Sequence, residues 1–261
     1  MKLLQGTVLS NTWVSPRYKH MSIHAPEIVE ECKAGQFFHL KCSDSFSPLL
    51  RRPMSIYKIV KKEGEIHFLY LIKGEGTKCL ANMHQGDQLN MFGPLGNGFT
   101  LQTEWHSLLI VARGVGLATM APLIDMATKQ GIATYAILSA RTKGDILSAD
   151  YMKECGAEVV SLTDEDRDSD VEHVRKMVEN VIDSKSIDAL FTCGSKRLTN
   201  MLKGISLQRK IPGQVAMEEN MGCGSGMCFC CVKPFNRGGE IVNLRVCSEG
   251  PVFQLEEVME L

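Results

Sequence analysis

Residues 107–116 of the 261-residue chain read Ser-Leu-Leu-Ile-Val-Ala-Arg-Gly-Val-Gly. The run Ser107–Ala112 is almost entirely apolar, which is typical of a strand buried on both faces of a sheet. A glycine-containing turn follows, and the pattern after it predicts a helix from about Leu117 to Lys129. A strand–turn–helix unit of this kind indicates a parallel sheet with helices packed on it.

The same alternation continues downstream. Valines at helical spacing predict an amphipathic helix over Asp170–Asp183, and another helix begins at Leu198–Leu202. Further buried strands are predicted at Ile132–Leu138, Glu158–Leu162 and Ala189–Thr192. We therefore expect a central α/β domain over residues 101–213.

Upstream, the first hundred residues contain short β-type runs separated by turn signals. Such runs at this spacing predict an antiparallel β-barrel over residues 1–100. The turn-rich stretch Gly93-Pro94-Leu95-Gly96-Asn97-Gly98 is expected to close it. The predicted strands are Gly6–Ser10, Phe37–Lys41, Ser55–Val60 and Ile66–Ile72. The whole chain is thus expected to be an α+β multidomain protein.

Charge and hydropathy exclude several classes of partner. Lys and Arg number 29 against 30 Asp and Glu, which argues against a nucleic-acid-binding arm or a polybasic membrane patch. No apolar run approaches the roughly 18–20 residues that cross a bilayer. Residues Met1–Ser10 lack the pattern of a signal peptide. We expect a cytoplasmic protein with no nucleic-acid or membrane partner.

The chain has ten cysteines, and five of them lie between Cys223 and Cys247. In a reducing cytoplasm a dense group of cysteines indicates metal binding rather than disulfides. The region after Pro212-Gly213 is also too short to bury a core of its own, and small domains of that size depend on a metal or cross-links. A small metal-binding domain is therefore expected over residues 214–261.

The spacing of these cysteines indicates the kind of metal. Cys223, Cys228 and Cys231 form a C-x4-C-x2-C run, and Cys247 follows after fifteen intervening residues. This is the spacing of plant-type [2Fe–2S] ligation. A structural zinc site is the alternative, although it usually shows two close C-x2-C-type pairs. Cys230 is an additional thiol that could replace Cys231, but only Cys231 gives the expected spacing.

Two motifs in the first hundred residues suit a flavin. In Arg51-Arg52-Pro53-Met54-Ser55-Ile56 a guanidinium can bind a phosphate while the strand and the hydroxyl face a flavin ring. Gly74-Glu75-Gly76-Thr77 can present backbone N–H groups at a helix start to a pyrophosphate. Taken singly, the first motif also fits a surface Arg pair beside an edge-strand Pro, and the second fits a simple turn.

Taken together and in order, these motifs resemble the electron-transfer subunits of dihydroorotate dehydrogenase, within the ferredoxin–NADP reductase superfamily. The resemblance covers essentially the whole chain, and the cysteine motif is its most specific part. The matching pieces are Arg52–Ile56, Gly74–Thr77, Gly93–Phe99, Cys193-Gly194, Cys223 to Cys247, and Gly250-Pro251-Val252-Phe253.

The resemblance implies a flavin-binding barrel (1–100), a nucleotide-binding α/β domain (101–213) and a [2Fe–2S] domain (214–261). It implies that the four cluster ligands are Cys223, Cys228, Cys231 and Cys247. The FAD contacts it implies are Arg52, Pro53, Met54, Ser55, Leu69, Tyr70, Leu71, Gly76 and Thr77. Leu71 stands where an Arg is expected in the family.

The turn from Val111 to Gly116 lies between a strand and a helix, where a dinucleotide phosphate binds, and Gly114 and Gly116 are its candidate contacts. The related proteins have glycines where Ala112 and Arg113 stand. Arg113 would either pair with a phosphate or obstruct it, and an ordinary tight turn is the alternative. By resemblance, Cys193 lies beside the nicotinamide. Because no basic cluster suits a 2′-phosphate, NADH is favoured over NADPH as the NAD(P) nucleotide.

The functional hypothesis is an oxidoreductase subunit that moves electrons between NAD(P)H, FAD and the cluster, without a catalytic acid–base residue. By resemblance, its partner is the flavin-containing catalytic subunit that oxidises dihydroorotate in pyrimidine biosynthesis, in a heteromer such as a heterotetramer. One alternative is an electron-transfer module for a different oxidoreductase. Another is a non-catalytic iron–sulfur or zinc protein that acts as a sensor or scaffold.

Overall fold

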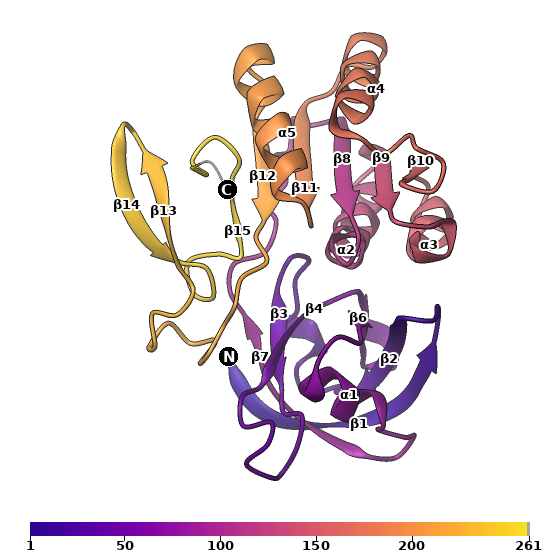
Figure 1. Cartoon of the computed structure of the whole chain (residues 1–261), viewed down its shortest axis with the longest axis vertical. Helices are drawn as coiled ribbons and strands as arrows, with labels where there is room; N and C mark the ends of the chain where they lie inside the picture. The colour runs from indigo at the N-terminus through magenta and orange to yellow at the C-terminus, as the bar shows by residue number, and fades with distance from the viewer. Residues whose placement is uncertain (260–261) are drawn as a thin grey trace.

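The computed structural model describes residues 1–259, and its strands form sheets of seven, six and two strands. In Figure 1 the seven-stranded sheet lies below the helix-covered six-stranded sheet, and the two-stranded hairpin stands to one side. The described helices include none that is both long enough and apolar enough to span a membrane.

The first sheet is antiparallel and has the strand order β4-β3-β7-β1-β2-β6-β5. Its edge strands β4 and β5 follow one another in the chain and are joined by Ile56 and Tyr57. The Ile56 N–H donates to the Gln36 carbonyl beside β3, and the Tyr57 N–H donates to the His67 carbonyl in β6. The predicted antiparallel strands are therefore confirmed, but the sheet is rolled into a half-barrel and not the complete barrel that was predicted. Its strands are β1 (Lys2–Trp13), β2 (Tyr18–His24), β3 (Phe37–Leu40), β4 (Arg52–Ser55), β5 (Lys58–Val60), β6 (Glu65–Leu71) and β7 (Gln88–Leu95), and helix α1 (Glu75–Ala81) follows β6.

Two details predicted for this region are wrong. A single strand over Ser55–Val60 does not exist, because the chain crosses there from one edge of the sheet to the other. The stretch from Gly93 to Leu95 is not a turn but the end of β7. A Cβ atom at Gly93 would lie 2.4 Å from the ring of Phe38, so this glycine permits close packing.

The second sheet has the order β10-β9-β8-β11-β12-β15, in which β15 alone is antiparallel to its neighbour. The predicted strands and the predicted helices over 117–129 and 170–183 are present, but the strand over Glu158–Thr163 lies at the edge of the sheet and is largely exposed, not buried as predicted. The strands are β8 (Ser107–Arg113), β9 (Ala133–Ala140), β10 (Glu158–Thr163), β11 (Ala189–Cys193), β12 (Gly213–Ala216) and β15 (Val252–Gln254), and the helices are α2 (Gly116–Lys129), α3 (Ala149–Glu154), α4 (Val171–Ser184) and α5 (Lys196–Arg209).

Strand β8 divides the core between the two faces of this sheet. Leu108 and Ile110 pack on the face that carries α2 and α3, whereas Leu109 and Val111 pack on the face that carries α4 and α5. This alternation is the period-two pattern of a strand. Tyr18, Tyr57 and Leu69 of the first sheet join the core on the α2 face, so helix α2 is packed between the two sheets.

The last part of the chain shares the core of the second sheet. Strands β13 (Val232–Arg237) and β14 (Glu240–Arg245) form the hairpin. Phe235 on the hairpin stacks on Phe253 in β15, with ring centroids 4.1 Å apart. Residues 214–216 of β12 and all of β15 lie within the predicted range 214–261 and pair with each other. Because β12 also pairs with β11 of the α/β region, the last part of the chain is attached by a shared sheet. The three predicted domain boundaries stay predictions.

The turn after β8 leads to a test of stability. A Cβ atom at Gly116 would lie 2.6 Å from the backbone carbonyl of Cys193, whereas one at Gly204 in α5 would meet nothing within 4 Å. We expect Gly116→Ala to lower the free energy of unfolding by about 1–3 kcal/mol, because the backbone must move. Gly204→Ala should raise it by about 0.5–1 kcal/mol through helix propensity. Urea unfolding checks both, and equal stability of the two variants would contradict the close packing.

Candidate functional site

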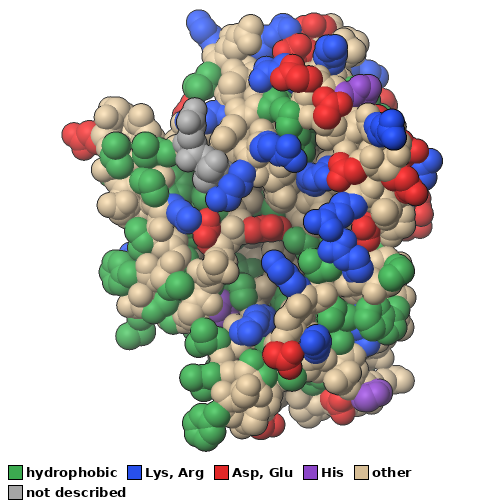
Figure 2. Space-filling view, in the orientation of Figure 1, with side chains coloured by type: hydrophobic (Ala, Val, Ile, Leu, Met, Phe, Trp, Pro, Cys, Tyr) green, Lys and Arg blue, Asp and Glu red, His purple; other side chains and the backbone are tan. Residues whose placement is uncertain are grey.

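A cavity of about 300 Å³ lies between the half-barrel, the start of α2 and the segment that follows β12. The space-filling view shows the molecule hollowed between the two sheets, with basic side chains near the rim (Figure 2). The walls are mostly apolar with a few polar groups, which is the usual character of a small-molecule site. The lining residues are Phe37, Arg52, Pro53, Met54, Ser55, Leu69, Tyr70, Leu71, Lys73, Thr77, Val115, Ala118, Thr119, Met217, Glu218, Glu219, Met221 and Pro251.

The structure brings together the residues predicted to contact FAD. All of them line this cavity except Gly76, which supports Arg52 from outside: a Cβ atom at Gly76 would lie 2.7 Å from Arg52 Nε. The Arg52 guanidinium donates to the Leu50 carbonyl at 2.7 Å. Thr77 Oγ1 accepts from the Lys73 and Gly74 N–H groups at 2.9 and 3.1 Å, which holds the loop before α1.

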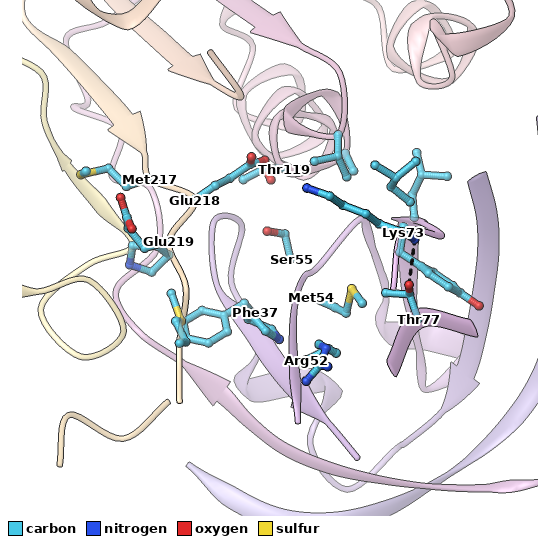
Figure 3. A pocket seen from close by; sticks show the side chains of 18 residues that line it. Phe37, Arg52, Met54, Ser55, Lys73, Thr77, Thr119, Met217, Glu218 and Glu219 are labelled. Atoms are coloured by element: carbon cyan, nitrogen blue, oxygen red, sulfur yellow. Dashed lines mark hydrogen bonds between the residues drawn. The ribbon is translucent and has the colours of Figure 1, made fainter. Parts of the chain in front are cut away.

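Sequence reasoning missed the residues that complete the cavity from the second sheet. Lys73 reaches from the loop after β6 toward Thr119 and Glu218, which come from α2 and the segment after β12 (Figure 3). No local motif marks these side chains, because they meet only when the two sheets pack together. The one feature of the sequence that could have indicated this part of the site is the position of Glu218, just beyond the end of strand β12.

Glu218 and Cys193 form a pair at this strand end. The Cys193 thiol donates to Glu218 Oε1 at 3.9 Å. Glu218 remains accessible from the cavity but is surrounded by protein, and this desolvation raises the pKa of its carboxyl. Complete burial raises the pKa of the Cys193 thiol well above its usual range. Cys193 itself does not line the cavity, and Glu218 is the group of this pair that faces it.

A second hollow of about 130 Å³ adjoins the first and shares Met217, Glu218 and Glu219 with it. It lies at the carboxyl ends of β11 and β12, beside the start of α5. In an open α/β sheet this is the edge at which nucleotides bind. The predicted residues Gly114 and Gly116 lie at the neighbouring end of β8, and only Val115 between them lines the first cavity.

Arg113 points away from this turn. Its guanidinium pairs with Asp164 at 2.6 Å, at the end of β10. Hydrogen bonds from Ser169 and Arg113, together with the Arg113 charge, lower the pKa of Asp164, so the pair is ionised near neutral pH. A Cβ atom at Gly114 would meet nothing within 4 Å. The backbone of the turn is therefore open on that side.

The four predicted metal ligands are arranged as two pairs of thiols. The Cys228 N–H donates to Cys223 Sγ, and the Cys247 N–H donates to Cys231 Sγ, each at 3.4 Å. Among residues 1–259, no group of three or more His, Cys, Asp or Glu is placed to hold a single metal ion. Cys230 lies outside both pairs, and its exposed thiol donates to the Asn220 carbonyl at 3.7 Å.

The two pairs differ in their electrostatics. Burial acts to raise the pKa of Cys223, but hydrogen bonds from Ser225 and Cys228 outweigh it and lower that pKa to about 6. Burial and the neighbouring Cys231 thiol raise the pKa of Cys247 to about 12. The charge of Cys223 also acts to raise the pKa of Cys247. Four thiolates at this site would therefore repel one another unless a positive charge lay between them.

The cysteine segment and the cavity share a wall. Met221 lines the cavity two residues before Cys223. Phe37 of β3 also lines it and belongs to the same apolar core as Cys231 and Cys247. His39, on the same face of β3 as Phe37, contacts Gly224 within the cysteine segment. The two sites are therefore in contact through single side chains.

Comparison with known proteins identifies the family. Residues 218–259 match the family described as "Iron-sulfur cluster binding domain of dihydroorotate dehydrogenase B". The chain is 33% identical to the dihydroorotate dehydrogenase B (NAD(+)) electron transfer subunit of Desulforamulus reducens, over 99% of this chain and 98% of the relative. It is 34% identical to the subunit of the same name from Bacillus velezensis, over 99% of each chain.

Solved structures show the same fold. A structure of the NADH-dependent reduced ferredoxin–NADP oxidoreductase matches with a TM-score of 0.80 at 24% identity, over 98% of this chain and 90% of that one. A ferredoxin–NADP+ reductase from Neisseria gonorrhoeae, solved with FAD and NADP, matches with a TM-score of 0.63 at 18% identity, over 80% and 92%. By its full-length similarity to the curated relatives, this chain belongs to the family of dihydroorotate dehydrogenase B electron transfer subunits.

Proposed function

We propose that this chain transfers electrons between NAD(H), an FAD in the larger cavity and a [2Fe–2S] cluster on Cys223, Cys228, Cys231 and Cys247. Its redox partner is the catalytic subunit of a dihydroorotate dehydrogenase B, in a heteromeric complex. The observation that carries the proposal is the shared wall: Phe37 and Met221 line the cavity and lie against or within the cysteine segment. A flavin in the cavity and a cluster on the thiols would be separated by single side chains.

The cavity suits a flavin in shape and charge. Pro53, Met54 and Leu69 give apolar walls for a ring system, and Ser55 supplies a hydroxyl. Arg52 is a candidate to bind a phosphate, because its side chain lines the cavity beside Gly76 and its guanidinium donates to the Leu50 carbonyl. FAD supplies the exchange of a hydride for single electrons, and the cluster carries those electrons one at a time.

The nucleotide is proposed to bind along the second hollow and the turn at Gly114 and Gly116, with the nicotinamide at the strand end where the buried Cys193 pairs with Glu218. The relatives' name specifies NAD(+), in line with the sequence preference for NADH. The open backbone at Gly114 and the start of α2 can bind a phosphate through N–H groups. Arg113 is occupied by Asp164 and does not fill that space.

The cysteines suit two iron ions better than one zinc ion. A zinc site draws four thiolates into one tetrahedron, whereas within residues 1–259 no three His, Cys, Asp or Glu side chains are placed to hold a single ion. Two buried polar groups without partners also adjoin the segment: His39 meets it at Gly224, and Ser248 Oγ meets it at Gly226. Since buried polar groups are nearly always hydrogen-bonded, a polar group bound within the segment would complete this site.

Reduction of the purified protein tests the function. The chain is purified anaerobically, and its visible spectrum is followed on addition of NADH. We expect the absorbance of both flavin and cluster to bleach. Bleaching by dihydroorotate should then occur only when the dihydroorotate dehydrogenase B catalytic subunit is added. A colourless protein that contains zinc would overturn the proposal, and bleaching by NADH without coupling to that subunit would indicate a different partner.

The contact between Gly76 and Arg52 gives a matched pair of variants. In Gly76→Ala the new Cβ atom displaces the flexible Arg52 side chain, so we expect FAD to bind about tenfold more weakly, equivalent to about 1.4 kcal/mol. In the control Gly74→Ala the new Cβ atom meets nothing within 4 Å. The FAD dissociation constant is measured by flavin fluorescence. Equal affinity in the two variants would show that Arg52 does not bind the flavin nucleotide.

The extra thiol provides a control for the metal site. Cys230→Ser should retain two irons per chain and an unchanged visible spectrum, because this thiol is exposed and lies outside both pairs. Cys231→Ser should lose most of the iron, since it removes one member of a buried pair. Iron and acid-labile sulfide analysis measures both. Retention of the cluster by Cys231→Ser together with its loss from Cys230→Ser would reverse the assignment.

A further inference from the structure

The side chain of His39 is fully buried, yet neither of its ring nitrogens has a hydrogen-bond partner within the described structure. Leaving a buried polar group unpaired costs roughly 1–3 kcal/mol. Arg51, whose charge acts on the His39 ring, donates to the backbone carbonyl of His39 at 3.3 Å and not to the ring. The neighbouring aromatic ring, Phe37, offers no polar atom. The described part of the chain therefore supplies no hydrogen-bond partner for the imidazole, and a partner would have to be a bound group.

The contact with Gly224 shows where that partner would lie. A Cβ atom at Gly224 would lie 3.0 Å from both Nε2 and Cδ2 of His39, so the Nε2 edge of the ring abuts the backbone between Cys223 and Cys228. Gly224 has φ +70°, a conformation that favours glycine. A larger residue there would also collide with the ring. Both features keep the imidazole against the cysteine segment.

We propose that His39 donates a hydrogen bond from its Nε2–H to a sulfur of the [2Fe–2S] group, either a bridging sulfide or a cysteine Sγ. This inference rests on the proposed function, because it requires the cluster. Reduction adds negative charge to the cluster, and a hydrogen bond to its sulfur atoms stabilises that charge. His39 thus raises the reduction potential of the cluster and eases electron transfer from the flavin.

Two variants separate this role from simple packing. His39→Phe keeps a planar ring without a donor, and His39→Gln keeps an N–H donor at a similar reach. We expect His39→Phe to lower the ratio of reduced to oxidised cluster at a fixed potential by about tenfold, or about 59 mV for a one-electron couple. His39→Gln should restore most of that loss. The potential is measured by anaerobic titration followed by electron paramagnetic resonance, with iron and flavin content as controls.

A second readout uses the wild-type protein. With ¹⁵N-labelled histidine, pulsed electron paramagnetic resonance of the reduced cluster should show a nitrogen coupling that His39→Gln removes. The inference would be overturned if both variants kept the wild-type reduction potential, or if both lowered it equally. It would also be overturned if the wild-type protein showed no nitrogen coupling. Those results leave the proposed function intact, because they presuppose a reducible cluster. Absence of a cluster from the wild-type protein would instead overturn the proposed function. If His39→Phe does not fold, the nitrogen coupling and His39→Gln decide the question.

Discussion

The arrangement of both sites depends on the alternation of side chains along one short strand. Strand β3 directs Phe38 and Leu40 into the core of the half-barrel, and this fixes its register against β4 and β7. Because successive residues of a strand face opposite sides, Phe37 and His39 then face outward, toward the cavity and the cysteine segment. A slip of one residue would place His39 in the barrel core and remove Phe37 from the wall that the two sites share.

The cysteine region lacks a core of its own and depends on its neighbours. Phe235 of the hairpin packs on Phe253, and β15 completes the edge of the second sheet. The buried thiols Cys231 and Cys247 belong to the same apolar core as α4 and α5. The pair Cys223 and Cys228, by contrast, lies nearer the surface. A bound metal group would therefore link the buried thiols of the core to a more exposed segment of the chain. Metal binding and the ordering of this segment are thus coupled.

The sequence predicted those parts of the fold that are recorded locally. The apolar run of β8 and the valine spacing of α4 reflect burial of their own residues, so periodicity was sufficient for both. It failed over Ser55–Val60, where β-type residues continue through a crossing between sheet edges, and at Gly93, which packs on Phe38. For the candidate site, the residues of the half-barrel were predicted by motif and meet at the cavity. Lys73, Thr119 and Glu218 were missed, because each acquires its position only through packing between the two sheets.

In the proposed nucleotide site, the ion pair of Arg113 determines how a phosphate would be held, not whether it can approach. The charge of Arg113 is neutralised by Asp164 across the end of β9. The turn therefore offers no free cation to a diphosphate, and the space beside Gly114 stays open. Binding would rest on backbone N–H groups and the positive end of the α2 dipole. Such a site interacts with phosphate by directional hydrogen bonds, so salt should weaken NADH binding less than it would at a site built on an unpaired arginine.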